Sequence, residues 1–340
     1  MLSATVSFMM NRDWLATTPE SALEPELEIV DPHHHLWDYE SLYGRYEIDD
    51  LAADTAAGHN VTETVFIDCG ANYFSDGPRH LRPVGETVYV TKRASLSITT
   101  PGARIAAIVG HADLTLGDGV REVLDAHREA ATVARFSGIR HSGARADDPT
   151  VPVSRTEPPA DLYQRADFQA GARVLADMGL SFEAWQYHHQ LPEVVALARA
   201  VPELTIVVNH LGGPLGVGRW AGQWAEVEGA VRTGLSALSE LPNVVLKVGG
   251  IGMTRTGTGW EQRPNPPTSD EVVAYWGDLL RFAIDTFGPE RCMFESNFPV
   301  DGATVSYVVL WNAFKKVSRP YSPAERAALF SATARRVYGI

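Results

Sequence analysis

The sequence predicts an α/β protein that folds as a single (β/α)8 TIM barrel with long loops after strands 2, 4 and 7. Eight short runs rich in apolar and β-branched residues alternate with stretches of helical periodicity, which is the pattern of eight parallel strands each followed by a helix. The 340 residues suit one such domain. Histidines stand at the ends of several runs, and the carboxyl ends of the strands are where such barrels carry their active sites.

We expect the eight strands at residues 27–33, 62–69, 104–111, 134–141, 180–186, 204–210, 243–249 and 292–297. Several of these runs are continuously apolar instead of alternating with polar residues, which is typical of strands that are covered on both faces. This pattern favours a barrel core surrounded by helices over an open sheet with one wet face.

The segments between the strands carry the period and the end signals of helices. Residues 120–134 have apolar side chains at spacings of three and four, and residues 191–200 have Pro192 in their first turn. Residues 220–241 and 271–287 are further long helices in this interpretation. Because strand and helix alternate, we expect right-handed crossovers and a parallel sheet.

Three connections are longer and less regular, at residues 70–102, 147–167 and 250–268, after the second, fourth and seventh strands. All three would leave the carboxyl ends of strands, where active-site loops belong. No linker or repeat divides the chain. We therefore expect residues 1–26 to be an N-terminal extension and residues 27–340 to form the barrel domain.

The composition limits the kinds of molecule that the protein is expected to bind. The formal net charge of −13 disfavours binding to nucleic acids and to anionic membranes, so a small-molecule substrate is expected. The first ten residues lack a basic segment, and no stretch approaches the roughly 18 apolar residues of a membrane span. The two cysteines, Cys69 and Cys292, lie in apolar runs and are expected to be small core residues. A cytoplasmic protein is expected, and a homo-oligomer is left open.

The positions of the histidines are the most informative feature of the chain. His33 and His35 are two residues apart at a strand end, so they share one face and can bind one divalent ion through neutral imidazoles at about 2.0–2.1 Å. His34 should point the opposite way, into strand–helix packing. Histidines at other strand ends are His111, His141, His188 and His210. His59, His80 and His127 fall in helix or loop contexts and are expected to be solvated.

Two further residues at the end of the fourth strand are candidates for contact with the substrate. Arg140 could clamp a carboxylate together with Arg82 or Arg145, and the alternative is a surface salt bridge. His141 is a candidate of the same kind, although an isolated histidine at a strand end is more often a hydrogen-bonded structural residue.

Three segments resemble the signature segments of the amidohydrolase-2 branch of the amidohydrolase superfamily. They are DPHHHLWD at residues 31–38, VNHLGGP at residues 208–214 and MFESNFPVD at residues 293–301. The resemblance extends from about Leu27 to Ile340. It implies a metal-dependent hydrolase on a TIM barrel, in a branch that includes sugar lactonases and pyrone-dicarboxylate or muconolactone lactonases.

The resemblance also implies roles for individual residues. His33, His35 and His210 would bind one divalent metal, of which Zn²⁺ is the expected one. His188, in the fifth-strand segment, would stand beside the reacting centre, and it is preferred to its neighbour because it shares a strand face with Gln186. Glu86 lies in a segment that recurs in this branch and would line the pocket.

The chain departs from the family at the eighth strand, where Asn297 replaces the usual aspartate. An amide can neither bind a metal as an anion nor take a proton from water at neutral pH. We therefore expect the metal to be weakly bound or absent, and another group to activate water. Asp301, just past Asn297, is one candidate, and Asp68, His188 and His210 are the others.

Three functions stay open at this point. The first is hydrolysis of a lactone, or of another small cyclic or acyl ester or amide, by activated water. The second is metal-dependent decarboxylation of an aromatic or muconate-type acid, which Asn297 disfavours because relatives with that activity keep the aspartate. The third is a non-catalytic barrel with a degraded set of ligands.

Overall fold

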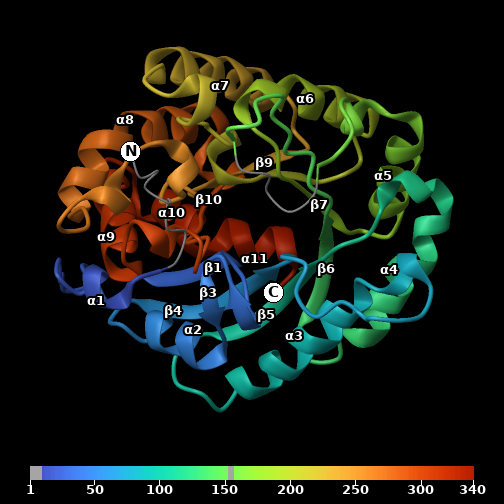
Figure 1. Ribbon diagram of the computed structural model, residues 1–340, viewed down its shortest axis with the longest axis horizontal. Coiled ribbons are helices and arrows are strands. Elements are labelled where there is room, and N and C mark those ends of the chain that lie inside the picture. The colour runs from blue at the N-terminus through green and yellow to red at the C-terminus, as the bar shows by residue number, and fades with distance from the viewer. Residues whose placement is uncertain (1–9, 152–156) are drawn as a thin grey trace.

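Eight parallel strands form a nearly closed barrel in the order β1-β4-β5-β6-β7-β8-β9-β10 in the computed structural model (Figure 1). All eight predicted strands are confirmed, with bounds that differ from the expected ones by no more than three residues. The strands are β1 Glu28–His34, β4 Asn60–Ile67, β5 Arg104–Gly110, β6 Arg135–Arg140, β7 Ser181–Ala184, β8 Ile206–Val208, β9 Val244–Val248 and β10 Cys292–Phe294.

The structure describes residues 10–151 and 157–340. The expected lack of a targeting signal concerns residues 1–9, which lie outside the described residues, as do residues 152–156 of the loop expected after the fourth strand. In the described part of the extension, α1 (Arg12–Leu15) is held by an ion pair from Arg12 to Asp54 at 2.9 Å. The indole of Trp14 donates to the carbonyl of Arg263 at 3.0 Å.

The barrel closes between its first and last strands, just beyond the end of β10. The amide of Asn297 donates to the carbonyl of His33 at 2.9 Å, and the amide of His35 donates to the carbonyl of Phe298 at 2.8 Å. These bonds tie the ends of β1 and β10 together, so the histidines of the first strand lie beside the residues that follow the eighth.

The helices surround the strands as an outer ring (Figure 1). All four predicted helices are confirmed, as α4 (Val120–Ala130), α6 (Leu191–Ala200), α7 (Trp224–Ser239) and α8 (Ser269–Phe287). The others are α2 (Ile48–Thr55), α3 (Val84–Ser97), α5 (Ala166–Asp177), α9 (Tyr307–Val317) and α10 (Pro323–Ala327). The helix after β6 is α5, which follows the long loop.

One sequence-based expectation needs correction, and one pair of strands was not expected. Residues 70–102 contain the 14-residue α3, so only the first part of that connection is irregular. The burial of Val84, Val90 and Ala94 along one side of α3 is a helical pattern that its many β-branched residues obscure. The hairpin of β2 (Trp37–Ser41) and β3 (Gly44–Tyr46) was not expected; it turns at Gly44, whose φ of 78° favours glycine.

Buried histidines also correct the sequence-based picture. His127 is fully buried, with Thr87 Oγ1 at 2.7 Å from Nδ1 and the carbonyl of His111 at 2.9 Å from Nε2. His59 is buried too and contacts Lys315 at 2.9 Å, so neither is solvated. His34 points away from its neighbours toward Thr64 Oγ1 at 3.1 Å, as expected.

A short C-terminal helix closes the amino end of the barrel. In Figure 1, α11 (Thr333–Tyr338) lies across the middle of the ring of strands. Ala334 and Tyr338 pack against inward-facing apolar residues of the strands, most of them valines such as Val30 and Val207. The Tyr338 hydroxyl donates to the Glu183 carboxylate. The opposite, carboxyl end of the barrel is left for the site.

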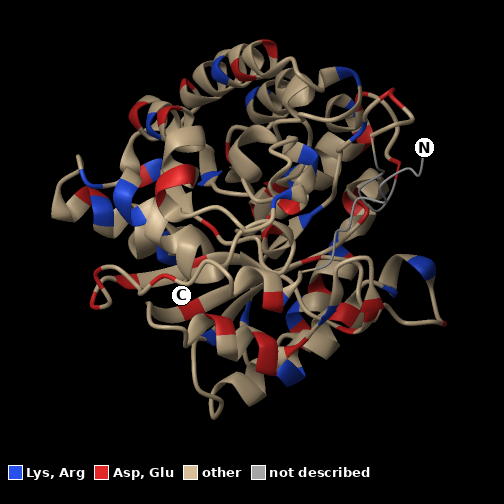
Figure 2. Ribbon diagram, turned by 60° about the vertical axis from the view of Figure 1, so that its left-hand side comes forward, with Lys and Arg blue, Asp and Glu red and all other residues tan. Residues whose placement is uncertain are grey.

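The surface carries acidic and basic residues interspersed over the outer helices (Figure 2). No helix among the described residues combines the length and apolar character required to cross a membrane.

Candidate active site

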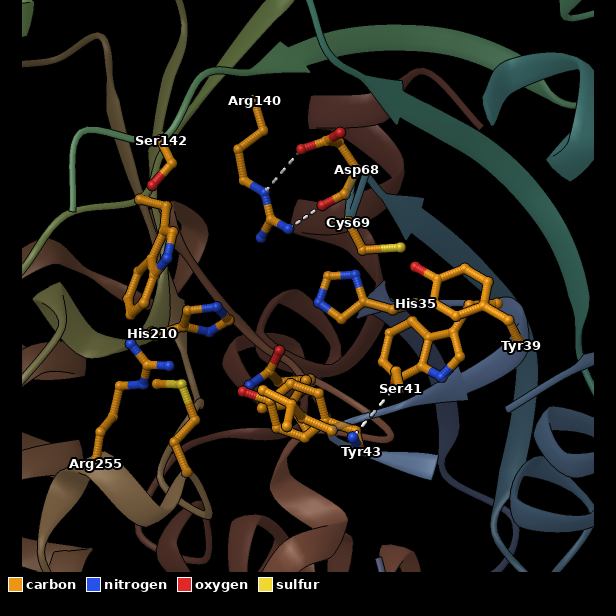
Figure 3. A pocket seen from close by; sticks show the side chains of 16 residues that line it. His35, Tyr39, Ser41, Tyr43, Asp68, Cys69, Arg140, Ser142, His210 and Arg255 are labelled. Atoms are coloured by element: carbon orange, nitrogen blue, oxygen red, sulfur yellow. Dashed lines mark hydrogen bonds and ion pairs between the residues drawn. The ribbon is translucent and has the colours of Figure 1, made fainter. Parts of the chain in front are cut away.

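A cavity of about 250 Å³ lies at the carboxyl ends of the strands (Figure 3). The β2–β3 hairpin covers one side of it with aromatic side chains, and the loop after β9 covers another. The residues that line it are His35, Trp37, Tyr39, Ser41, Leu42, Tyr43, Asp68, Cys69, Arg140, Ser142, Trp185, His210, Met253, Arg255, Asn297 and Val300. Cys69 thus lies beside the cavity and not in the core, whereas Cys292 is buried as expected.

Glu295, just after β10, holds two histidines that come from distant parts of the chain. The backbone amide and Nδ1 of His210 both donate to Glu295 Oε1, at 3.0 and 2.8 Å. The other carboxylate oxygen lies 2.7 Å from Nδ1 of His33. Since a carboxylate accepts hydrogen bonds, the proton of the His210 ring is fixed on Nδ1, and its Nε2 keeps a lone pair. Nη1 of Arg140, which can only donate, lies 3.3 Å from Nε2 of His33, so that nitrogen is the acceptor of the His33 ring.

His35 follows the same pattern with a different partner. Its Nδ1 donates to the carbonyl of Ile67 at 2.8 Å, and its Nε2 lies 3.3 Å from Nε2 of His33. Two lone pairs at that separation repel unless a cation or a donor lies between them. Two nitrogens bound to one tetrahedral zinc at 2.0–2.1 Å would be roughly 3.3–3.4 Å apart, so the spacing suits one ion.

Burial keeps the three imidazoles neutral. Burial of His33, His35 and His210 lowers the pKa of each ring below its usual range, and neighbouring positive charges add to this in each case. Neutral imidazole is the form that binds a metal. The group His33, His210 and Glu295 has the mutual spacing of a metal site, but the Glu295 oxygens already lie at the Nδ1 atoms of the two histidines. The donors left for one divalent cation are the Nε2 atoms of His33, His35 and His210, and the ring centres of His33 and His210 are 4.5 Å apart.

A buried ion pair lies beneath His33 inside the barrel. Lys247 of β9 lies 2.9 Å from Glu183 Oε2 of β7 and 3.3 Å from Nδ1 of His33. The side-chain amide of Asn209 and the Tyr338 hydroxyl also donate to Glu183. Charges that are fully buried persist only when they are paired and hydrogen-bonded, and this cluster meets both conditions.

Arg140 and Asp68 lie together on another side of the cavity (Figure 3). Nη1 of Arg140 lies 3.3 Å from Nε2 of His33, and Nη2 donates to the carbonyl of Asp68. The Asp68 carboxylate accepts from the Tyr73 hydroxyl at 2.8 Å and lies 3.9 Å from Nε of Arg140. Arg140 is only 8% exposed and so is no surface salt bridge. Its expected companion Arg145 is paired with Asp147 instead.

Asn297 and Asp301 form a pair in which only one member reaches the cavity. Nδ2 of Asn297 donates to Oδ1 of Asp301 at 2.7 Å, and the amide of Gly252 donates to Oδ2 at 2.8 Å. Burial raises the pKa of Asp301 well above its usual range. Asn297 lines the cavity with a left-handed backbone, φ 53°, whereas Asp301 lies behind it.

Three other expected site residues lie outside the cavity lining. His188 begins a 3-10 turn after β7 has ended at Ala184, and its ring packs on Trp220. His141 accepts from the Leu114 amide at 3.3 Å. Glu86, in the first turn of α3, accepts from the amides of Ala71 and Cys69 at 2.7 and 3.1 Å and braces the loop beside Asp68.

Several residues of the site were missed by the sequence reasoning. Glu295 stands two positions before Asn297, so strand periodicity places both on the inner face. Lys247 interrupts the apolar run of β9, which is itself a signal of a buried partner. No local pattern distinguishes Arg255 within its irregular loop.

Two glycines at the end of β9 make room for these side chains. A Cβ atom on Gly249 would lie 2.4 Å from Cγ of Glu295, and one on Gly250 would lie 2.4 Å from Cβ of His210. The left-handed φ of Gly250, 66°, adds to that requirement. The backbone at the end of β9 can therefore come close to Glu295 and His210 only because these two positions are glycines.

The chain is similar to amidohydrolases along nearly its whole length. The family model for amidohydrolases, Amidohydro_2, matches residues 30–340. The chain is 32% identical to the uncharacterized protein y4mH of Sinorhizobium fredii, over 93% of this chain and 99% of that protein. It is 27% identical to an L-fucono-1,5-lactonase of Burkholderia multivorans, over 92% and 96% of the two chains. A solved amidohydrolase structure from Burkholderia multivorans with bound zinc shares the fold, with a TM-score of 0.70, 23% identity, and coverage of 92% and 99%.

Proposed function

The chain belongs to the amidohydrolase family, and from this membership we propose that it hydrolyses a lactone or another small cyclic ester. One observation carries the proposal: imidazole lone pairs, a carboxylate and a guanidinium gather around one cavity at the carboxyl end of the barrel. The lactonase among the relatives supports the same substrate class.

His33, His35 and His210 are the residues that would hold a divalent metal, for which Zn²⁺ is our expectation. Ile67 and Glu295 accept from the Nδ1 atoms of His35 and His210, so those rings offer Nε2. In His33, Nε2 is the nitrogen that faces the Arg140 donor. A bound ion would polarise a carbonyl oxygen and favour deprotonation of water at neutral pH. The zinc in the related solved structure supports this expectation.

The side chains of this chain supply the remaining chemistry. Asp68 is the one carboxylate among the described residues that line the cavity, so we propose it as the acceptor of the proton from the attacking water. Arg140, beside it, donates hydrogen bonds to the oxygen on which negative charge develops. Nδ2 of Asn297 donates to Asp301. We therefore propose that its side-chain carbonyl oxygen faces water or substrate. Asp301 and His188 would not touch the substrate, in contrast to the roles first expected for them.

A panel of γ- and δ-lactones, followed by proton release and by product analysis, tests the proposal. The wild-type chain should open at least one ring, and the double substitution His33→Ala/His35→Ala should abolish the activity. Asp68→Asn should lower kcat by about 10²-fold or more, the range for loss of a general base. His80→Gln, at a partly exposed histidine that does not line the cavity, should leave kcat and KM unchanged.

Other outcomes of this experiment would contradict the proposal. Release of CO₂ from an aromatic or muconate-type acid, with no ring opening of any lactone, would assign the decarboxylase function instead. Turnover that is unchanged in His33→Ala/His35→Ala would remove the reaction from this cavity. If wild type and variant both leave the whole panel intact, a non-catalytic barrel is the better description.

A further inference from the structure

Arg255 is a buried cation on the wall of the cavity, 7% exposed, in the 3-10 turn of the loop after β9. Nη1 donates to the Tyr187 hydroxyl at 2.6 Å, and the guanidinium also contacts the Tyr43 phenol. The guanidinium carbon lies 6.0 Å from the Trp185 ring centre and 5.9 Å from that of Tyr187. Two phenols and two aromatic rings thus fix its position.

None of these partners carries a negative charge. Among the described parts of the chain, no aspartate or glutamate lies within ion-pairing distance of the Arg255 guanidinium. An arginine keeps its proton at any pH at which a protein is folded. Buried charges are normally paired or fully hydrogen-bonded. Among the other buried cations of the described residues, Lys247 and Arg140 have Glu183 and Asp68 beside them. Lys315 donates to the carbonyls of Leu23 and Glu24. Arg255 has phenol oxygens as its hydrogen-bond partners and faces a cavity, so a ligand in the cavity can supply the negative charge that pairs with it.

The location of Arg255 tells which molecule would supply that charge. Figure 3 shows its guanidinium on the side of the cavity where His210 lies, across from His35, while Arg140 and Asp68 stand apart from it on a third side. A ligand can therefore place one end between the histidines and Arg140 and another end against Arg255. The aspartate and arginine side chains on the wall are Asp68, Arg140 and Arg255, so two cations face one carboxylate and the cavity favours an anion.

We propose that Arg255 binds a carboxylate on the substrate, so that the substrate of this site is an anionic lactone whose carboxylate lies away from the ring carbonyl that reacts. The proposal rests on the proposed function and narrows it. A guanidinium presents parallel N–H donors that match the two oxygens of a carboxylate. With Tyr187 and Tyr43 holding the group in place, little side-chain entropy is lost on binding. Arg255 is thus a specificity-determining residue and takes no part in the bond-breaking step.

Binding of an unreactive pair of ligands tests this directly. Tetrahydrofuran-2-carboxylate and tetrahydrofuran-2-carboxamide have the same shape, carry no lactone carbonyl and differ in charge. Titration of the full-length wild-type protein should show at least tenfold tighter binding of the carboxylate, since hydrogen bonds to charged groups exceed neutral ones by about that factor. Equal affinity for the two ligands would overturn the proposal. The comparison uses the wild-type protein alone, so it does not depend on whether a variant folds.

Variants then locate the anion. Arg255→Met should remove the preference for the carboxylate and leave carboxamide binding unchanged, Arg255→Lys should keep part of it, and Arg145→Met, at a surface arginine, should keep all of it. A preference that survives in Arg255→Met but disappears in His33→Ala would place the carboxylate at the histidines and overturn the proposal.

Kinetics separate this inference from the proposed function. With a γ-lactone that carries a ring carboxylate, Arg255→Met should raise KM at least tenfold with little change in kcat, while the matching carboxamide lactone should be unaffected. If no lactone reacts with wild type but the binding preference exists and depends on Arg255, the proposed function fails and the anion site stands. If wild type and Arg255→Met both hydrolyse lactones equally well with or without a carboxylate, the proposed function stands and the anion site at Arg255 is wrong.

Discussion

At the scale of single residues, Asn297 and Asp301 show how one exchange is absorbed locally. The amide donates to the buried carboxyl behind it at 2.7 Å, so the two side chains form a complementary pair. A carboxylate at position 297 alone would face a second carboxyl at the same distance, and two such groups cannot both ionise. The position that faces the cavity is therefore coupled to the one that lies behind it.

The first prediction follows from this coupling. Asn297→Asp alone should raise zinc occupancy only slightly, because the new carboxyl shares a proton with Asp301. The exchange Asn297→Asp/Asp301→Asn restores a donor behind a carboxylate and should raise occupancy well above wild type. Elemental analysis after dialysis against a fixed free-zinc concentration measures both, with Asp301→Asn as the control. Stoichiometric zinc in wild type, held as tightly as in the exchanged pair, would contradict it.

His127 gives a prediction for the dependence of stability on pH. Burial lowers its pKa to about 4, against about 6.5 for an unfolded histidine. Between these values the unfolded chain binds a proton that the folded chain does not, so stability falls as the pH drops from 6.5 toward 4, by up to about 3 kcal/mol from this residue. The free energy of unfolding in urea should differ less between pH 5 and pH 7.5 for His127→Gln than for wild type. An unchanged difference would mean that His127 is not neutral in the folded protein.

At the scale of elements, the strands of the barrel are coupled through the Lys247–Glu183 pair. Lys247 comes from β9 and Glu183 from β7, and between them β8 is only three residues long. The Tyr338 hydroxyl of the C-terminal helix donates to Glu183, and Lys247 lies 3.3 Å from Nδ1 of His33 in the first strand. The pair thus joins the C-terminal helix to two strands of the barrel directly beneath the site.

Substituting one member of this ion pair should lower the free energy of unfolding more than substituting both members. Lys247→Met leaves the Glu183 carboxylate buried without its cation, which costs about 3–5 kcal/mol of unfolding free energy. Lys247→Met/Glu183→Gln leaves no unpaired charge and should recover most of that loss. Urea denaturation of the three proteins measures the effect. If Lys247→Met is as stable as wild type, the ion pair is not what holds these strands.

At the scale of the whole molecule, the barrel brings together positions 33 and 35 from the end of its first strand and position 210 from the end of its sixth. A ligand that binds all of them only when the chain is folded stabilises the fold by mass action, by about 2.7 kcal/mol at a hundred times its Kd. Zinc at such a concentration should raise Tm by several degrees, and a chelator should reverse the rise. His33→Ala should show no rise, and a rise equal to that of wild type would place the ion elsewhere.

The sequence by itself determined the architecture and the first half of the site. Eight apolar runs, the helices between them and the pair His33 and His35 follow from periodicity, because burial on both faces and a two-residue repeat are local properties. His210 was also located, since the end of a barrel strand always faces the mouth.

Only the tertiary structure decided which other groups reach the cavity. His188 turns away because β7 ends at Ala184, so the two-residue period no longer sets its direction. Asp68 lines the cavity and Asp301 does not, and Arg255 arrives from an irregular loop. Glu295 acquires its role only when β1 and the turn after β8 lie on either side of it. The direction of a side chain past the end of a strand depends on turns such as the left-handed ones at His210 and Asn297, and packing, more than local sequence, selects those turns.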